Sequence, residues 1–129
     1  HLQSVIISNS CKGVYMDNIF KQTLLYDFYG ELLNEHQRKV YEDAVFNDLS
    51  LSEVADNYGV SRQAIHDLIK RVTKMLEKYE NKLHMIERFA KMQDIAQGIK
   101  DTIAEYKESR NDKLLDKISE DTELIIDEF

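Results

Sequence analysis

The spacing of apolar residues along the chain predicts a succession of amphipathic helices. Apolar side chains recur every three or four positions over most of its length, which places them on one face of an α-helix. From Asp17 to Tyr29 the stripe consists of Phe20, Leu24, Leu25 and Phe28. Gly30 follows at once and is expected to end or bend this first helix.

Two capping signals mark the starts of the next helices. In "NEHQ", Asn34 can cap through its side-chain oxygen, while Gln37 can bond back to the cap. Ser50 and Glu53 have the same spacing in "SLSE" and predict a short helix that ends near Tyr58. The buried face of the helix that Asn34 begins is expected to hold Val40, Tyr41, Ala44 and Val45.

A glycine separates this short helix from a much longer apolar stripe. Gly59 can supply a positive φ without a Cβ penalty, and Ser61 is a natural N-cap. A helix from Arg62 to about Met92 would be about 45 Å long at 1.5 Å per residue. Its stripe comprises Ile65, Leu68, Val72, Leu76, Tyr79, Leu83, Ile86 and Ala90.

Two further stripes predict C-terminal helices on either side of the polar "ESRNDK". The chain has no proline and only four glycines, and few of its segments alternate as strands do. The predicted fold class is therefore all-α. The first stripe holds Ile95, Ile99, Ile103 and Tyr106, and the second holds Leu114, Leu115, Ile118, Ile125 and Ile126.

The stretch from about residue 50 to 72 is typical of a helix-turn-helix motif. Such a pair needs a small residue at the helix crossing, a glycine in the turn and apolar residues on the inner face of the second helix. The expected motif core satisfies all three demands and consists of Val54, Ala55, Tyr58, Gly59, Val60, Ile65 and Leu68.

Composition narrows the class of protein further. Of the 129 residues, 43% are hydrophobic and 32% are charged, and no apolar run approaches the roughly 20 residues that span a bilayer. A single cysteine, Cys11, leaves no internal disulfide and favours a reducing compartment, so we expect a cytoplasmic protein without membrane contact. Residues 1–15 lack helical periodicity and are interpreted as a leader or unstructured extension.

The quoted motifs resemble known sequences. The capped helices "SLSEVA" and "GVSRQAI" resemble the last DNA-binding region of bacterial sigma factors. Together, "LLYDFYGELL", "DLSLSEVADNYGVSRQAIHDLIKR" and "MLEKYENKLHMIERF" resemble the YlxM family, small helix-turn-helix proteins of Gram-positive bacteria. The resemblance covers about Met16 to Phe89. It implies a sigma region four-like core, a C-terminal extension, and a regulatory role in the signal recognition particle pathway through contact with the particle's GTPase.

The outward face of the second motif helix is the candidate contact surface. Arginine and glutamine can read base edges, and lysines can meet phosphates. Against DNA contact, Asp67 lies within this face and the whole chain carries a formal charge of -7. Residues 61–82 hold six basic and three acidic residues, so we expect weak DNA binding and keep a protein partner as the first hypothesis. The candidate residues are Arg62, Gln63, His66, Lys70, Arg71 and Lys74.

The sequence favours neither an enzyme nor a metal protein. Four histidines occur without a paired histidine four positions away, and we find no phosphate loop or nucleophile elbow. We therefore assign no catalytic residue, no metal and no cofactor.

The expected organisation is a leader at 1–15, a helix-turn-helix domain at 16–82 and a C-terminal helical extension at 83–129. The tail from Asn111 to Phe129 has two basic and seven acidic residues and suits a solvated face or a basic partner. Ile86, Phe89 and Ala90 are expected to lie beyond the reach of the motif domain. The long stripe and the C-terminal stripe need a cover, which is either the C-terminal helices folded back within one chain or a second copy of the chain. We expect the second copy, and therefore a homodimer through the long and C-terminal helices.

Overall fold

The computed structural model describes residues 18–128, and the leader expected at residues 1–15 lies outside them. Its elements are all helical, which confirms the all-α class, and no strand occurs among these residues. None of the helices in the described range has both the length and the apolar character needed to cross a membrane. In chain order they are α2 (Asn18–Tyr29), η1 (Gly30–Leu32), α3 (Glu35–Val45), α4 (Leu51–Tyr58), α5 (Arg62–Leu83), α6 (Met85–Ser109) and α7 (Lys113–Asp127).

The described residues form two compact packing units. The N-terminal unit ends at Ile86 and the C-terminal unit begins at Glu87. Because α6 begins at Met85, its first two residues belong to the N-terminal unit. The packing of each unit is therefore described separately.

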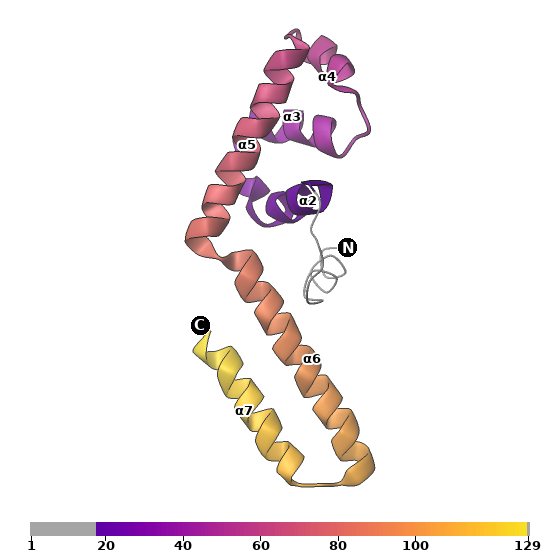
Figure 1. The fold of residues 1–129 in the computed structure, drawn as a ribbon, viewed down its shortest axis with the longest axis vertical. Coiled ribbons are helices and arrows are strands. Elements are labelled where there is room, and N and C mark those ends of the chain that lie inside the picture. The colour runs from indigo at the N-terminus through magenta and orange to yellow at the C-terminus, as the bar shows by residue number, and fades with distance from the viewer. Residues whose placement is uncertain (1–17, 129) are drawn as a thin grey trace. The chain divides into compact units, whose positions relative to one another are not determined.

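In the N-terminal unit, α5 runs along one side and α2, α3 and α4 all pack against it (Figure 1). Two clusters of buried side chains lie along its inner face. One combines Val40, Val54, Ala55 and Ile65, and the other combines Leu25, Tyr29, Leu33, Tyr41, Val72 and Leu76. Helix α5 thus contributes to both clusters and ties the unit together.

The second cluster extends further along the chain than the sequence suggested. Ile86 packs against it, so the expectation that Ile86 lies beyond the reach of the motif domain is wrong. Tyr41 is fully buried there, and its hydroxyl lies 2.9 Å from Oγ1 of Thr73 on α5. This contact satisfies the polar end of a large buried side chain.

Capping residues start the helices where the sequence predicts. The Gln37 backbone N–H donates to Oδ1 of Asn34 at 2.8 Å, and the Asn34 N–H donates to Oε1 of Gln37 at 3.1 Å. These two bonds complete the expected capping box. Ser50 accepts from the Glu53 N–H at 3.1 Å, and Ser61 accepts from the Ala64 N–H at 3.0 Å.

The predicted long helix from Arg62 to about Met92 is wrong, because the helix breaks at His84. Helix α5 ends at Leu83, His84 adopts a left-handed conformation with φ 53°, and α6 begins at Met85. Helix α6 then continues through Gly98 to Ser109, so the stripe at 95–106 is not a separate helix.

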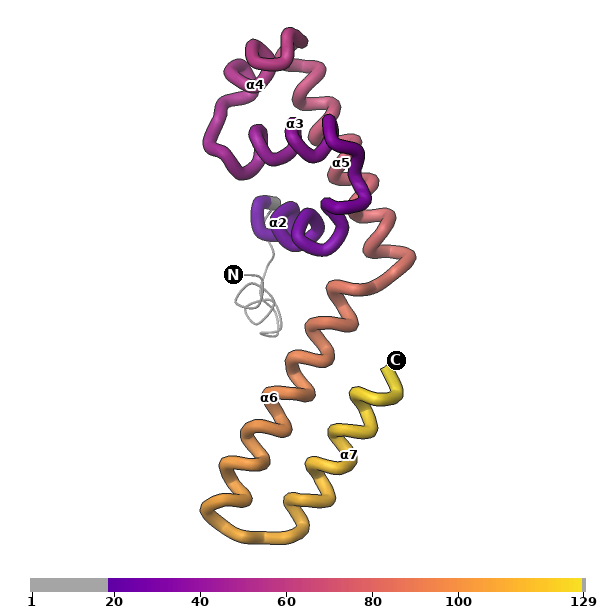
Figure 2. The backbone as a smooth tube through the Cα atoms, turned by 180° about the vertical axis from the view of Figure 1, so that it is seen from behind, coloured from indigo at the N-terminus to yellow at the C-terminus, as the bar shows by residue number. Residues whose placement is uncertain are grey.

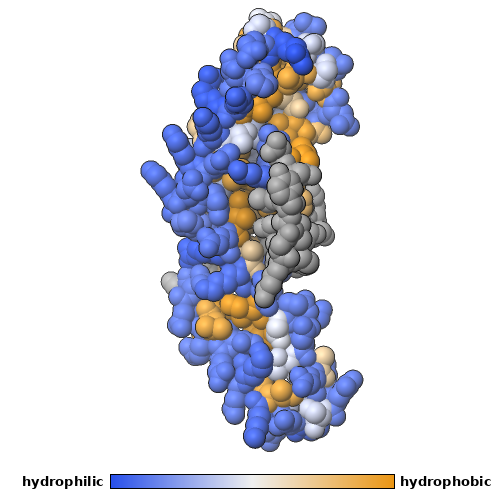
Figure 3. All heavy atoms as spheres, in the orientation of Figure 1, coloured by the Kyte–Doolittle hydropathy of each residue, from blue (hydrophilic) through white to orange (hydrophobic). Residues whose placement is uncertain are grey.

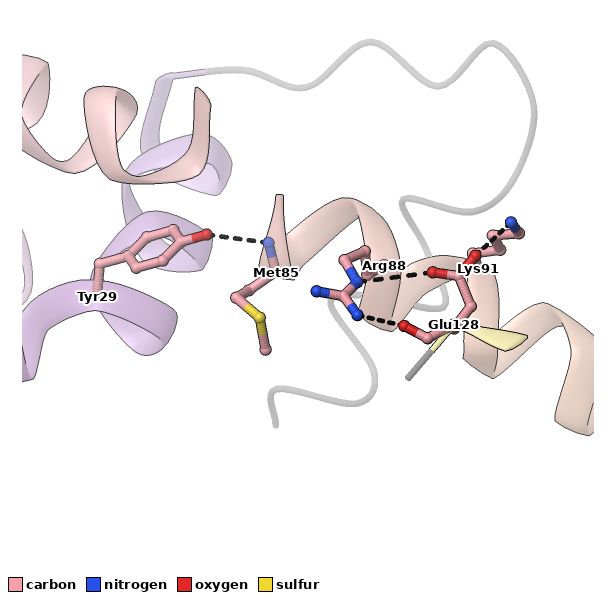
Figure 4. A network of polar contacts seen from close by, with 5 residues as sticks. All are labelled: Tyr29, Met85, Arg88, Lys91 and Glu128. Atoms are coloured by element: carbon pink, nitrogen blue, oxygen red, sulfur yellow. Dashed lines mark hydrogen bonds and ion pairs between the residues drawn. The ribbon is translucent and has the colours of Figure 1, made fainter. Parts of the chain in front are cut away.

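A tyrosine and a glutamate stabilise this break. The Tyr29 hydroxyl donates to Glu80. It also accepts from the Met85 backbone N–H at 3.1 Å, and Figure 4 shows this second bond. Oε1 of Glu80 also accepts from the Ile86 N–H at 3.0 Å. The first backbone N–H groups of a helix have no acceptor within the helix. The side chains of Tyr29 and Glu80 accept from two of these groups at the start of α6. Burial and the bond to Glu80 raise the pKa of Tyr29 to about 12.

We expect Tyr29→Phe to lower the free energy of unfolding by about 1–2 kcal/mol, because a buried hydroxyl with two partners is lost. Hydrogen exchange of the Met85 amide should accelerate in the same variant. Tyr79→Phe is the matched control, since the ring of Tyr79 packs on Tyr29 at 6.0 Å between centroids. Unchanged exchange at Met85 would show that Tyr29 does not cap α6.

The C-terminal unit is an antiparallel hairpin of α6 and α7 (Figures 1 and 2). The chain reverses at Arg110, whose φ is 55°. At the far end of the hairpin, the side chains of Arg88 and Lys91 both contact Glu128 (Figure 4). The bond to Lys91 holds the pKa of Glu128 below its ordinary value. These contacts join the end of α7 to the start of α6 within one chain.

Candidate nucleic-acid or partner interface

The turn between α4 and α5 is built on Gly59, which has φ 66° and ψ 33°. The Val60 N–H donates to the Ala55 carbonyl at 3.0 Å, and the Gly59 N–H donates to the Asp56 carbonyl at 3.3 Å. This pair of bonds is a Schellman motif, which requires a left-handed residue after the helix. It turns the chain sharply so that Ser61 can begin α5.

The structure places the expected motif core on both sides of this turn. Val54, Ala55 and Ile65 are buried together, and half-buried Tyr58 and Leu68 pack against them. Gly59 itself is exposed at the corner.

Val60 departs from this expectation, because its side chain is 46% exposed and is not part of the core. Its backbone completes the Schellman motif, which holds the residue at the outer corner of the turn. Including Val60 in the motif core was therefore wrong.

Helix α4 is also held from the side of α3. The Tyr58 hydroxyl donates to Oδ2 of Asp43 at 2.9 Å, and this bond raises the pKa of Tyr58. The ring of His36 meets the Tyr58 ring edge-on at 5.8 Å between centroids. Both contacts hold the C-terminal end of α4 against α3, next to the turn that leads into α5.

All six candidate contact residues are exposed on α5. Hydrophilic residues cover the outer side of this helix, away from α2, α3 and α4 (Figure 3). At its N-terminal end a shallow hollow opens between the two motif helices. The hollow is lined by Leu51, Arg62, Gln63 and His66.

The carboxylate of Asp67 interacts with two neighbouring side chains on this face. The Gln63 amide donates to Oδ1 of Asp67 at 2.9 Å, and Nδ1 of His66 lies 3.8 Å from the same oxygen. The glutamine amide that would read a base is thus bonded to a carboxylate. The N-terminal half of the face, which enters the groove in helix-turn-helix complexes, carries a negative charge at its centre.

The other two acidic residues of α5 have partners away from this face. Glu77 pairs with Lys21 of α2 at 3.4 Å, and Glu80 joins the network at the start of α6. Beyond Asp67 the exposed cations form no ion pair within residues 18–128. We call this row the basic stripe, and it consists of Lys70, Arg71, Lys74, Lys78 and Lys82.

Lys78 and Lys82 were missing from the candidate set. They follow Lys70 and Lys74 at intervals of four residues, and this spacing alone could have identified them.

Comparison with known proteins decides the family. The family model described as "Putative helix-turn-helix protein, YlxM / p13 like" matches residues 16–120. The chain belongs to this family. The resemblance inferred from the motifs is therefore confirmed, and it extends beyond Phe89 into α7.

Curated relatives share the same family name. A UPF0122 protein of Halalkalibacterium halodurans is 42% identical over 88 residues, covering 68% of this chain and 81% of the relative. One from Malacoplasma penetrans is 46% identical over 98 residues, covering 76% of this chain and 82% of the relative. One from a Thermoanaerobacter species is 37% identical over 113 residues, covering 88% of this chain and 97% of the relative. Their names state no reaction, ligand or partner.

Proposed function

We propose that this protein is a regulatory helix-turn-helix adaptor that works by protein contact in the signal recognition particle pathway. The pathway and its GTPase as partner come from the family resemblance. The exposed face of α5 is the contact surface in this proposal. The protein has no catalytic role in it.

The pairing of Gln63 with Asp67 carries the choice of a protein partner over DNA. A carboxylate in the groove-reading part of α5 repels phosphates, and it already occupies the glutamine amide. A protein surface can place a cationic side chain opposite Asp67, whereas the base edges of DNA offer only neutral amino donors between the phosphates. The basic stripe further along α5 then suits an acidic patch on the same partner.

Binding of the full chain to the purified GTPase tests this proposal. The variant Lys70→Glu with Arg71→Glu should weaken binding by at least about tenfold, because it reverses two adjacent exposed charges. Lys39→Glu is the matched control, since Lys39 is an exposed cation on α3. No binding to the GTPase, or equal weakening by the control, would overturn the assignment of this face.

DNA is the second candidate, and the basic stripe is the observation that favours it. Five exposed cations without ion pairs in the described range can neutralise phosphates irrespective of base sequence. In this alternative the protein is a transcription regulator, and Arg62 and His66 approach the bases.

We expect any DNA binding to be weak and salt-sensitive. The surplus of only three positive charges over residues 61–82 keeps the binding weak. If all five cations of the basic stripe meet phosphates, the slope of log K against log salt is about -4.5. Asp67→Asn should strengthen DNA binding, because it removes the carboxylate that lies within the candidate contact surface on α5. Fluorescence anisotropy on mixed DNA fragments measures both effects. Tight binding that elevated salt leaves unchanged would favour the transcription regulator instead.

A further inference from the structure

The C-terminal unit lacks a core of its own. Among described residues 87–128 only Thr102 is buried, and its hydroxyl bonds to the Gly98 carbonyl of its own helix. Large apolar side chains remain exposed, including Ile103 at 41% and Ile126 at 57%. Two helices can cover only one stripe on each other, so a second apolar stripe needs another partner.

Each helix of the hairpin carries such a second stripe. Successive residues rotate by about 100° around an α-helix. On α6 the residues facing α7 are centred on Thr102, and on α7 the residues facing α6 are centred on Ile118. A quarter turn away, α6 presents Met92, Ala96, Ile99 and Ile103, and α7 presents Leu115, Ser119, Thr122 and Ile126.

The two stripes lie on the same side of the hairpin. On each helix the second stripe lies about 90° from the residues that face the other helix, in the direction in which residue numbers increase. Because the two helices are right-handed, antiparallel and face each other, this rotation turns both stripes toward the same side of the hairpin. Gly98 and Asp121 approach each other on the opposite side, where a Cβ on Gly98 would lie 3.9 Å from the Asp121 carboxylate. The second stripes therefore join into one surface, which we call the apolar face.

The apolar face can accept a closely packed helix. Ala96 and Ser119 are small, and the Thr122 hydroxyl donates to the Ile118 carbonyl at 2.8 Å, which leaves its methyl group to make contacts.

Charges of opposite sign flank the apolar face. The outer edge on α6 is basic and carries Lys100 and Lys107. The outer edge on α7 is acidic and carries Asp116, Glu120 and Glu123. All five of these side chains are exposed. The half of the hairpin nearest its turn therefore has a basic edge of two lysines and an acidic edge of three carboxylates, so the surface is self-complementary in charge there.

We propose that a second copy of this chain covers the apolar face and that the two hairpins form a four-helix bundle. A two-fold axis parallel to the helices places the basic edge of one copy beside the acidic edge of the other. It also makes every pair of neighbouring helices antiparallel, as in up-down bundles. A two-fold axis perpendicular to the helices would instead set lysines against lysines and carboxylates against carboxylates. The charge pattern therefore selects both the occupant and the symmetry.

The apolar contact is tested by sedimentation of the full chain at micromolar concentration. The wild type should have twice the chain mass of 15.2 kDa. Ile103→Asp and Ile126→Asp should each give a monomer with unchanged helical circular dichroism. Leu124→Asp is the matched control, because Leu124 is 51% exposed on α7 but lies on the opposite side of the hairpin. A monomeric wild type, or dissociation by Leu124→Asp alone, would overturn the proposal.

The symmetry is tested with charge reversals that leave the apolar face intact. Lys100→Glu with Lys107→Glu should weaken the dimer by about tenfold or more, because attraction becomes repulsion at both edges of the bundle. Adding Glu120→Lys and Glu123→Lys to the same chain should restore it. The perpendicular arrangement predicts no loss from the first pair, so an unaffected dimer would refute the parallel axis. A dimer that resists both the charge and the isoleucine variants would place the contact elsewhere.

Discussion

Replacing Leu76 by alanine is expected to lower the free energy of unfolding of the N-terminal unit by about 2–5 kcal/mol. Leu76 is fully buried in the cluster that joins α5 to α2 and α3. The change removes the transfer free energy of the deleted carbons and leaves a cavity, because a cluster fixed by Tyr29 and Tyr41 can collapse only in part. Urea denaturation followed by circular dichroism measures the loss.

Leu83→Ala is the control for this experiment, since Leu83 lies on the same helix and is exposed. Its effect should stay within about 0.5 kcal/mol, because both residues have high helix propensity and little packing is lost. Equal effects of the two changes would mean that the inner face of α5 is not the core of this unit. Leu76→Ala should also spare partner binding under conditions where the variant remains folded, because its side chain does not reach the outer face.

Local chemistry explains why the helix starts could be predicted. A cap needs one side-chain oxygen and one backbone N–H three residues later, so Asn34 and Ser61 signal their helices without tertiary information. The left-handed turn at Gly59 is equally local, since few other residues tolerate its φ. These features were confirmed at the predicted residues.

The break at His84 could not be predicted from the same signals. Apolar positions continue across it, and the chain there holds neither proline nor glycine. The break depends on Tyr29, more than fifty positions earlier, whose hydroxyl accepts from the Met85 N–H. Pairing over such a distance leaves no periodic trace, so the pattern indicated one continuous helix.

The candidate face shows the same division between local and distant causes. Helical spacing was enough to place Arg62 and Lys70 on the outside of α5, and a four-residue interval brings Gln63 to Asp67. The partners of Glu77 and Glu80 lie on α2 and required the folded structure. Only with those two residues paired elsewhere does the basic stripe extend as far as Lys82.

Gly59→Val is expected to destabilise the motif by about 2–3 kcal/mol, more than any exposed substitution on α4 or α5. The expected loss is one of backbone strain, because a Cβ at this position would meet no atom within 4 Å. A β-branched residue at φ 66° is strained wherever it is placed, and relieving that strain would break the bond from the Val60 N–H to Ala55. The two buried partners across the turn, Ala55 and Ile65, would then separate.

Two controls separate strain from size in this experiment. Asparagine has a side chain about as large as that of valine but tolerates a left-handed backbone. Gly59→Asn should therefore lower the free energy of unfolding clearly less than Gly59→Val. Ser52→Val places the same side chain on an exposed position of α4 and should change the thermal midpoint little. Equal midpoints for Gly59→Val and the wild type would show that the turn is not left-handed at residue 59. Equal losses from valine and asparagine would show that the turn rejects any side chain, and crowding would then replace strain as the cause.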